Sequence, residues 1–225
     1  MIEDLLVRYI RIQIKIAYWF DFFGTSWFKF TTENGESIRI EKLRYLVSNI
    51  KLGDRTKNYQ LINIGENSGT EIIINHVELG NHRLQFTFGF FNPDNIDGIY
   101  KDLNSVNFNV PIMLGGGYHF MQFDGKYKDT NNQDSNFNYH VIRAVDRTDS
   151  NNSIFEDTSI WFDLGNIEVK NNATIEIKMN IAEWFKNPNT WNLNELNTVL
   201  MPNFEAQKMM NANGKSVFSL GEISQ

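Results

Sequence analysis

The chain has 225 residues, with 21 Lys and Arg against 27 Asp and Glu, and therefore a formal net charge of −6. It lacks the clustered positive charge of nucleic-acid-binding domains, so we expect no nucleic-acid partner. The absence of Cys excludes thiol catalysis, disulfides and iron–sulfur clusters. The histidines number four: His76, His82, His119 and His140.

Apolar and polar residues alternate along most of the chain, a pattern typical of half-buried β-strands. The pattern predicts strands at residues 9–18, 37–40, 59–63, 71–75, 83–88, 118–123, 139–145, 160–164 and 173–179. Segments rich in Gly, Asn and Asp at 129–138 and 148–152 predict loops. Many short strands separated by turn signals predict an all-β fold, an antiparallel β-sandwich.

The last fifth of the chain has a different pattern, which predicts a short C-terminal helical segment. Residues 181–186 precede Pro188 and form a first short helix, because the residue before a proline disfavours helical geometry. Asn203 is a suitable N-cap for a helix over 204–213, with Gly214 as its stop, and a strand at 217–220 follows. Because no linker is evident, we expect a single domain over 1–225.

The sequence gives no export signal and no membrane span. No run of 18 or more apolar residues occurs, so we expect no transmembrane segment. The N-terminus lacks the basic start and apolar stretch of a signal peptide, which taken alone predicts a cytoplasmic protein. A leader removed from the start of the chain is the alternative interpretation.

The segment 111–126 carries the most suggestive set of side chains. On the predicted strand 118–123, His119 and Met121 share one face, and pairing with the next strand brings His140 towards His119. Two imidazoles with thioethers from Met113 or Met121 form a soft donor set that suits copper(I). Ordinary packing of a histidine beside a methionine is the other interpretation of the same pattern.

Motifs of catalysis are missing from the sequence. There is no Gly-x-Ser-x-Gly nucleophile elbow and no His-Glu-x-x-His metalloprotease motif. Gly214-Lys215-Ser216 lacks the earlier glycine of a phosphate-binding loop and follows a predicted helix instead of preceding one. We therefore expect a protein that is not an enzyme.

Several segments together resemble a known family. Residues 30–52, which include Asn34-Gly35-Glu36 and Lys42-Leu43-Arg44-Tyr45 followed by Ser48-Asn49-Ile50, are similar to a long signature of the MbnP-like domain, the methanobactin-associated copper-binding protein family. Gly117–Met121 with Gly125 resembles the next glycine–tyrosine strand, and Tyr139-His140-Val141 a later step that contains histidine. The matches keep the family order over residues 12–182.

The resemblance implies a periplasmic or outer-membrane-anchored lipoprotein with a β-sandwich fold, and it implies bound copper, as Cu(I) or Cu(II), in copper acquisition or handling. Its implied partners are a di-haem peroxidase-like protein or an outer-membrane transporter. Only His140 falls on a histidine of the family pattern; His119, Met113 and Met121 would complete the metal site. In some members an oxidised tryptophan joins the site, and residues 112–116 here replace the tryptophan-rich run.

A second functional class stays open. A β-sandwich that has lost its copper site would serve as a non-catalytic binding module for a glycan, a peptide or an envelope partner. The aromatic content supports this alternative, since exposed aromatic side chains mark recognition surfaces. The candidate residues are Trp19, Trp27, Trp161, Trp184 and Trp191.

Overall fold

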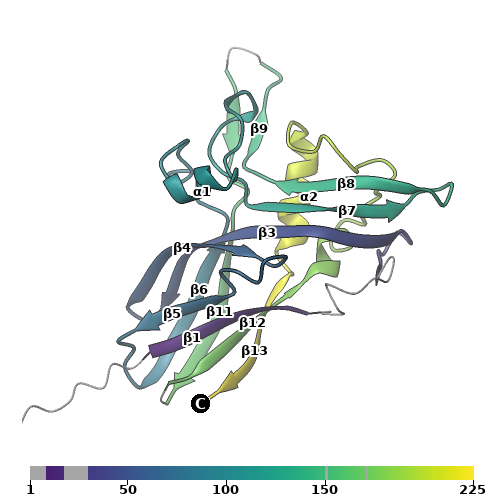
Figure 1. Cartoon of the computed structure of the whole chain (residues 1–225). Coiled ribbons are helices and arrows are strands. Elements are labelled where there is room, and N and C mark those ends of the chain that lie inside the picture. Colours follow the sequence, from purple (N-terminus) through teal and green to yellow (C-terminus); the bar gives the residue numbers. More distant parts are fainter. Residues whose placement is uncertain (1–8, 18–29, 150–151, 171) are drawn as a thin grey trace, which may run out of the picture.

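A computed structural model describes residues 9–17, 30–149, 152–170 and 172–225. Two β-sheets and a two-stranded hairpin hold nearly half of these residues (Figure 1). The strands are β1 (Tyr9–Ala17), β2 (Phe30–Thr31), β3 (Ser37–Leu52), β4 (Arg55–Asn63), β5 (Glu71–Asn75), β6 (Gly80–Phe88), β7 (Met121–Lys128), β8 (Asp134–Val141), β9 (Ala144–Asp146), β10 (Ile154–Glu156), β11 (Ile160–Val169), β12 (Thr174–Asn180) and β13 (Phe218–Ser224). The helices are α1 (Lys101–Ser105), α2 (Phe204–Gly214) and the 3₁₀ turns η1 (Ile112–Leu114) and η2 (Ile181–Phe185). The predicted all-β fold with a short C-terminal helix is confirmed.

The larger sheet is organised around the 16-residue strand β3. Its neighbours run in the order β11-β6-β3-β7-β8, and β2 and β4 also pair with β3. The sequence predicts only residues 37–40 of this strand. Residues 45–48 are all buried, so the alternation on which that prediction rests disappears in the middle of the strand.

One edge of β3 changes partner at Leu46. The N–H of Leu46 donates to Phe120 O, and its carbonyl accepts from Gly89 N–H, each at 2.9 Å. Pairing with β7 therefore ends at this residue and pairing with β6 begins. Gly89 has a φ of +81°, and a Cβ there would overlap the Phe120 ring. A glycine is required where the two strands meet end to end.

The smaller sheet has the order β13-β12-β1-β5. The pairs β12–β13 and β1–β5 are antiparallel, as predicted for the sandwich, whereas β1 pairs with β12 in parallel. The parallel pair joins strands more than 150 residues apart in sequence, an arrangement that local alternation does not encode.

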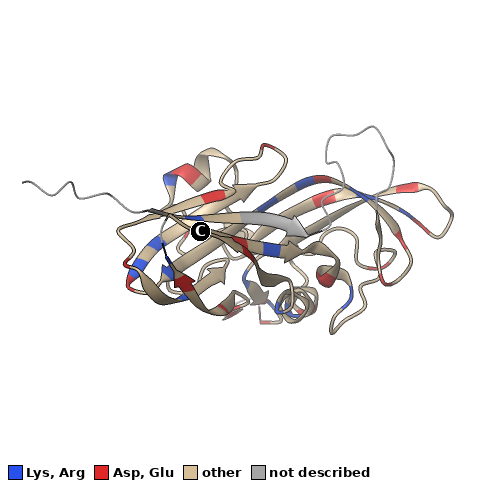
Figure 2. Ribbon diagram, turned by 90° about the horizontal axis from the view of Figure 1, so that it is seen from below, with Lys and Arg blue, Asp and Glu red and all other residues tan. Residues whose placement is uncertain are grey.

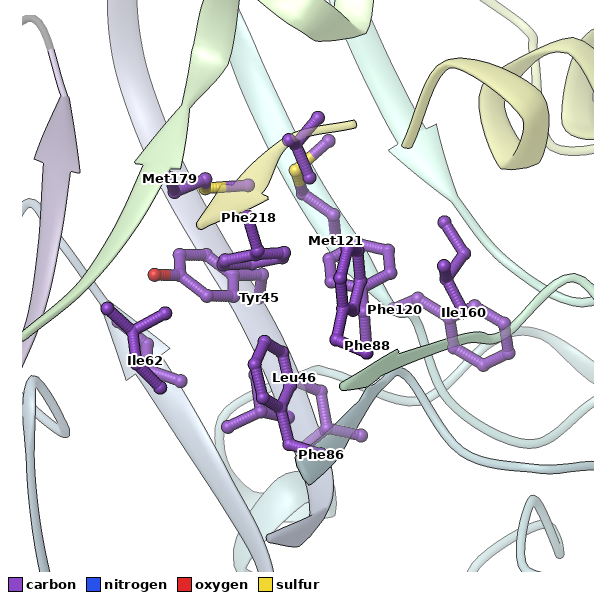
Figure 3. Packing of buried hydrophobic residues seen from close by; sticks show 14 of the residues in the cluster. Tyr45, Leu46, Ile62, Phe86, Phe88, Phe120, Met121, Ile160, Met179 and Phe218 are labelled. Atoms are coloured by element: carbon purple, nitrogen blue, oxygen red, sulfur yellow. The ribbon is translucent and has the colours of Figure 1, made fainter. Parts of the chain in front are cut away.

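The hydrophobic core lies between the two sheets (Figure 3). Phe218 on β13 contacts Tyr45 of β3, with ring centres 5.9 Å apart, and Phe86 of β6, at 5.2 Å. Met179 of β12 is also fully buried in this cluster. Such aromatic contacts add to the free energy gained by burying apolar surface.

The C-terminal helical segment packs against the larger sheet. The Asn203 side chain accepts a hydrogen bond from Ala206 N–H at 3.0 Å, which confirms the predicted N-cap. The prediction of Gly214 as a stop is wrong: Gly214 is the last helical residue and is needed because a Cβ there would overlap Ile160 and Trp184. The predicted helix at 181–186 is the 3₁₀ turn η2.

The predicted loop at 129–138 is shorter in the structure, because β8 already begins at Asp134. Its inward side chain Phe137 is fully buried, but exposed asparagines on either side hide the alternation.

Charged residues of both signs are interspersed along strands and loops (Figure 2). Within the described residues, no helix is both long enough and apolar enough to cross a bilayer.

Candidate functional site

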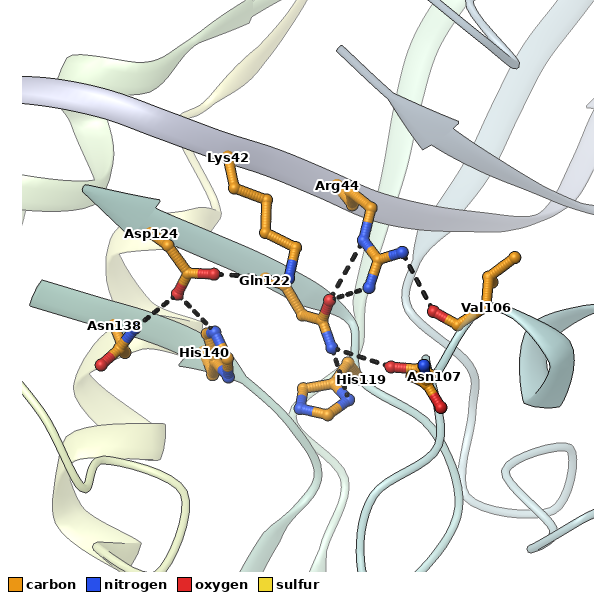
Figure 4. A network of polar contacts seen from close by, with 9 residues as sticks. All are labelled: Lys42, Arg44, Val106, Asn107, His119, Gln122, Asp124, Asn138 and His140. Carbon is orange, nitrogen blue, oxygen red and sulfur yellow. Dashed lines mark hydrogen bonds and ion pairs between the residues drawn. The ribbon is translucent and has the colours of Figure 1, made fainter. Parts of the chain in front are cut away.

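The outer face of β3, β7 and β8 carries two rows of polar side chains. Strand register sets both rows, because each residue on this face lies opposite its partner on the next strand. The first row is Arg44, Gln122 and His140, and the second is Lys42, Asp124 and Asn138. Figure 4 shows their polar contacts. A continuous polar surface thus crosses three strands of the sheet.

The opposite face of the same strands belongs to the core. Its two rows are Leu43, Phe123 and Tyr139, followed by Tyr45, Met121 and Val141, all buried. The strict alternation between the two faces fixes which side chains of β7 and β8 can meet a ligand from the polar side.

The ring of His140 is oriented by a hydrogen bond to Asp124. The Nε2 atom of His140 lies 2.7 Å from Asp124 Oδ1, which also accepts from Asn138 Nδ2 at 2.7 Å. Partial burial raises the pKa of Asp124, but the hydrogen bonds from His140 and Asn138 and the charge of Lys42 outweigh it and bring the pKa to about 2. Asp124 is therefore ionised at neutral pH, and its Oδ1 accepts the hydrogen bond that Nε2–H of His140 donates.

That tautomer leaves Nδ1 of His140 with a lone pair, and no side chain of the described residues bonds to it. The backbone of His140 is also anchored, since its carbonyl accepts from Gln207 Nε2 of α2 at 2.9 Å. Gln207 is fully buried, and its Oε1 accepts from Ile142 N–H at 2.9 Å. The helix α2 thus fixes the end of β8 that presents His140.

His119 is buried, with 4% of its surface exposed. Its Nδ1 lies 3.0 Å from the Phe108 carbonyl, so Nδ1 carries the proton and donates it. Its Nε2 is buried without a hydrogen-bond partner. Burial, together with the neighbouring His140, lowers the pKa of His119 to about 4. The neutral ring therefore holds an unused lone pair inside the protein.

Gln122 lies next to His119 and is fixed in orientation by Arg44. The guanidinium of Arg44 donates to Gln122 Oε1, with Nε at 3.1 Å, and also donates to the Val106 carbonyl at 3.0 Å. The Gln122 amide nitrogen therefore points towards the Asn107 carbonyl, at 3.3 Å. Arg44 and Gln122 thus bond to each other, and their bonds to the carbonyls of Val106 and Asn107 hold the segment after α1 against the sheet.

The two imidazole rings come together at the edge of this network. The ring centres of His119 and His140 are 5.2 Å apart, and the ring planes are inclined by 86° (Figure 4). In both rings one nitrogen donates to a protein oxygen and the other keeps a lone pair. This is the arrangement that orients metal-binding histidines. Metal–nitrogen bonds of about 2 Å allow one ion to contact two rings at this separation.

The structure corrects the placement of Met121. Met121 was predicted on the same face as His119, but Phe120 and Met121 are both fully buried, so the alternation slips by one residue between His119 and Gln122. The thioether of Met121 packs in the core on the other side of the sheet (Figure 3). Met113 lies on η1 with 83% of its surface exposed. Met121 therefore does not join the two histidines, and Met113 as a metal ligand stays a prediction.

Among the described residues, no group of three or more His, Asp or Glu side chains is arranged to hold a metal ion. Asp124 lies beside His140, but its Oδ1 orients the His140 ring and its Oδ2 pairs with Lys42. The buried, unpartnered Nε2 of His119 and the Nδ1 lone pair of His140 are thus the donor atoms that fit a metal at this position.

Comparison with known proteins places the chain in a family. A model of the MbnP family matches residues 10–202, which is 193 of the 225 residues. The chain belongs to the MbnP family. Its structure is similar to that of MbnP from Methylosinus trichosporium, with a TM-score of 0.55 and 11% identity over 96% of this chain and 98% of that chain. No curated protein sequence matches the chain.

The MbnP-family segments recognised in the sequence occupy the strands that build the polar surface. The first motif, residues 30–52, covers β2 and β3; the glycine–tyrosine motif leads into β7, and the motif with His140 ends β8. Sequence reasoning did not single out Asp124 or Gln122. The alternation of β7 places both residues on the polar face, but only if Phe120 and Met121 are both known to face the core.

The tryptophans do not form an exposed cluster in the described part of this MbnP-family chain. Trp184 and Trp191 are fully buried, and Trp161 has 54% of its surface exposed. Trp19 and Trp27 lie outside the described residues. Among the described tryptophans, Trp161 is the one whose exposure fits a recognition surface.

Proposed function

We propose that the chain is a copper-binding protein of the cell envelope that acts in copper acquisition or handling, with His119 and His140 as ligands. The proposal rests on the pair of imidazoles. Each ring is fixed by a hydrogen bond from one of its nitrogens, so that the other nitrogen keeps a lone pair. A buried polar atom without a partner costs about 1–3 kcal/mol, a cost that metal ligation at His119 Nε2 would remove.

The donor set favours a transition metal. Neutral imidazole suits copper, zinc, iron and nickel, whereas magnesium and calcium prefer oxygen ligands. Membership of the MbnP family, through its methanobactin association, supports copper over the other metals. Copper is here the cargo of a protein without catalytic activity, and the chain's own residues bind and orient it.

The envelope location and the partners rest on the family resemblance. A periplasmic or outer-membrane-anchored lipoprotein would receive copper outside the cytoplasm and pass it to, or accept it from, a di-haem peroxidase-like protein or an outer-membrane transporter. Sequencing the mature N-terminus of the protein purified from its native host tests the location, because export leaves a processed or lipidated end.

Anaerobic calorimetric titration with Cu(I) tests the metal site. The unmodified protein is expected to bind with an affinity better than micromolar, and His119→Ala and His140→Ala are each expected to weaken binding strongly. His82→Ala is the matched control, because His82 lies on β6 and its Nε2 contacts the Glu78 carbonyl instead. Absence of uptake, or unchanged uptake after His140→Ala, would remove the proposal. Circular dichroism shows whether each variant is folded.

A further inference from the structure

A pocket lies on the same large sheet, away from the residues of the candidate metal site. It is a pocket of about 270 Å³ between the paired strands β3 and β4 and the segment that leads into α1. Its lining residues are Ser48, Asn49, Asn58, Tyr59, Phe90, Asp94 and Tyr100. Small-molecule pockets usually start at about 300 Å³, so this one has room for a single small ring.

Three aromatic rings form one wall of the pocket and are held rigidly. Phe90 and Tyr100 stack with centres 4.6 Å apart, and Tyr59 meets Tyr100 edge to face at 4.8 Å. Both phenol groups are tied down: Tyr59 donates to Asp102 at 2.7 Å, and Tyr100 donates to the Asp94 carbonyl at 3.0 Å. Fixed rings of this kind cost little entropy when a ligand packs on them.

Two asparagines supply the polar side of the pocket. Asn49 lies within an irregularity in the pairing of β3 with β6, and it has a left-handed φ of +48°. Bulges of this sort redirect a side chain, and left-handed residues other than glycine often mark functional sites. Asn58 lies across from it on β4, because Ser48 pairs with Tyr59 and Ile50 with Lys57. Neither side-chain amide has a partner among the described residues.

The chemistry of the lining selects a class of ligand. No Lys or Arg contributes to the wall, and Asp94 adds a negative charge, so anions such as phosphate are disfavoured. Carboxamides both donate and accept hydrogen bonds, and the hydroxyl groups of a sugar do the same. The aromatic wall offers an apolar surface for the C–H face of a sugar ring.

We propose that this pocket binds a neutral monosaccharide unit, as a free sugar or as the end of an oligosaccharide. Asn49 and Asn58 bond to its hydroxyl groups, and the rings of Tyr59 and Tyr100 contact its apolar face. The site is independent of copper, and its carbohydrate-binding residues are not tryptophans.

Saturation-transfer NMR on the full chain without metal tests the pocket. The probes are methyl glycosides of glucose, galactose, mannose and N-acetylglucosamine, with choline as a cationic alternative. We expect transfer to at least one glycoside, and a loss of affinity of about 2- to 10-fold in each of Asn58→Ala and Asn49→Gly, since each removes one side-chain amide. Glycine keeps the left-handed backbone at position 49.

Asn136→Ala is the control, because Asn136 is an exposed strand asparagine on β8, outside the pocket. This variant is expected to bind the glycoside like the unmodified protein. Binding of choline without any glycoside, no transfer to any probe, or glycoside binding that both pocket variants retain in full would each overturn the proposal.

Discussion

The imidazole rings of His119 and His140 lie 5.2 Å apart and almost perpendicular to each other, although they come from different segments of the chain. Each ring is oriented by an oxygen on its far side: the Phe108 carbonyl for His119 and the Asp124 carboxylate for His140. The two remaining lone pairs are therefore set by the fold before any ion arrives. Preorganisation of this kind is what a metal-binding pair requires.

Asp124→Asn should weaken copper binding while the fold is kept. An amide is neutral and cannot stabilise the Nε2–H tautomer of His140 as the carboxylate does, and loss of such a partner typically costs about 10- to 100-fold in metal affinity. Competition with a colorimetric copper(I) chelator measures the change. Asp134→Asn, at the hairpin end of β8, is the control and should bind copper normally; equal affinity in all three proteins would contradict the role given to Asp124.

His119 should stay neutral far below the usual range of histidine. Burial and the neighbouring His140 lower its pKa from 6.5 to about 4. Between these two pH values His119 is protonated in the unfolded chain but neutral in the folded protein. Its contribution to stability is complete above pH 6.5 and is lost as the pH falls from 6.5 towards 4, with a slope of up to about 1.4 kcal/mol per pH unit.

Nitrogen-detected NMR of the metal-free protein measures the protonation state of His119 directly. The His119 ring should give the pattern of a neutral Nδ1–H tautomer down to about pH 4. Urea unfolding between pH 7 and pH 4 should show a smaller pH dependence in His119→Gln than in the unmodified protein. Protonation of His119 near pH 6.5 would show that the ring is not buried as described.

The two methionines should respond in opposite ways to substitution. Met113→Ala removes an exposed side chain, so both stability and copper affinity should stay unchanged. Met121→Ala leaves a cavity in the core and should lower the free energy of unfolding by about 2–5 kcal/mol. Urea denaturation and copper titration of both variants check this. A large loss of copper affinity in Met113→Ala would instead identify Met113 as a thioether ligand.

Gly89→Ala should destabilise the protein where β6 and β7 meet. Alanine is strained at a φ of +81°, by about 1–2 kcal/mol, and its Cβ would also press on the Phe120 ring. Gly98→Ala is the matched control: φ is +75°, and nothing lies within 4 Å of the new Cβ. Thermal unfolding should show a larger loss at Gly89. Equal losses would mean that the contact with Phe120 relaxes at no cost.

Much of the architecture follows from local pattern. Strand β5 (Glu71–Asn75) matches its predicted limits, and β1 and β12 lie within a residue or two of theirs, because alternation reports one buried face. The middle of β3 was missed, since residues 45–48 are buried on both faces and no alternation remains. The parallel pairing of β1 with β12 depends on contacts between distant parts of the chain, which a local pattern does not contain.

Alternation and strand pairing predicted the histidine pair of the candidate site but not the residues around it. Hairpin pairing of β7 and β8 indicated that His119 and His140 approach each other. The assignment of Met121 to the same face was wrong, because two consecutive residues, Phe120 and Met121, both turn into the core at the start of β7. Asp124 and Gln122 then occupy the face that the methionine was expected to share.

X-ray absorption spectroscopy of the copper-loaded protein determines whether His119 and His140 bind the metal, since it reports the atoms bound to copper. We predict scattering from two imidazole rings, with copper–nitrogen distances of about 2 Å, and no sulfur shell. The imidazole signal should fall in His119→Ala and in His140→Ala. A sulfur shell near 2.3 Å, or an imidazole signal that both variants leave intact, would contradict a copper site built on these two histidines.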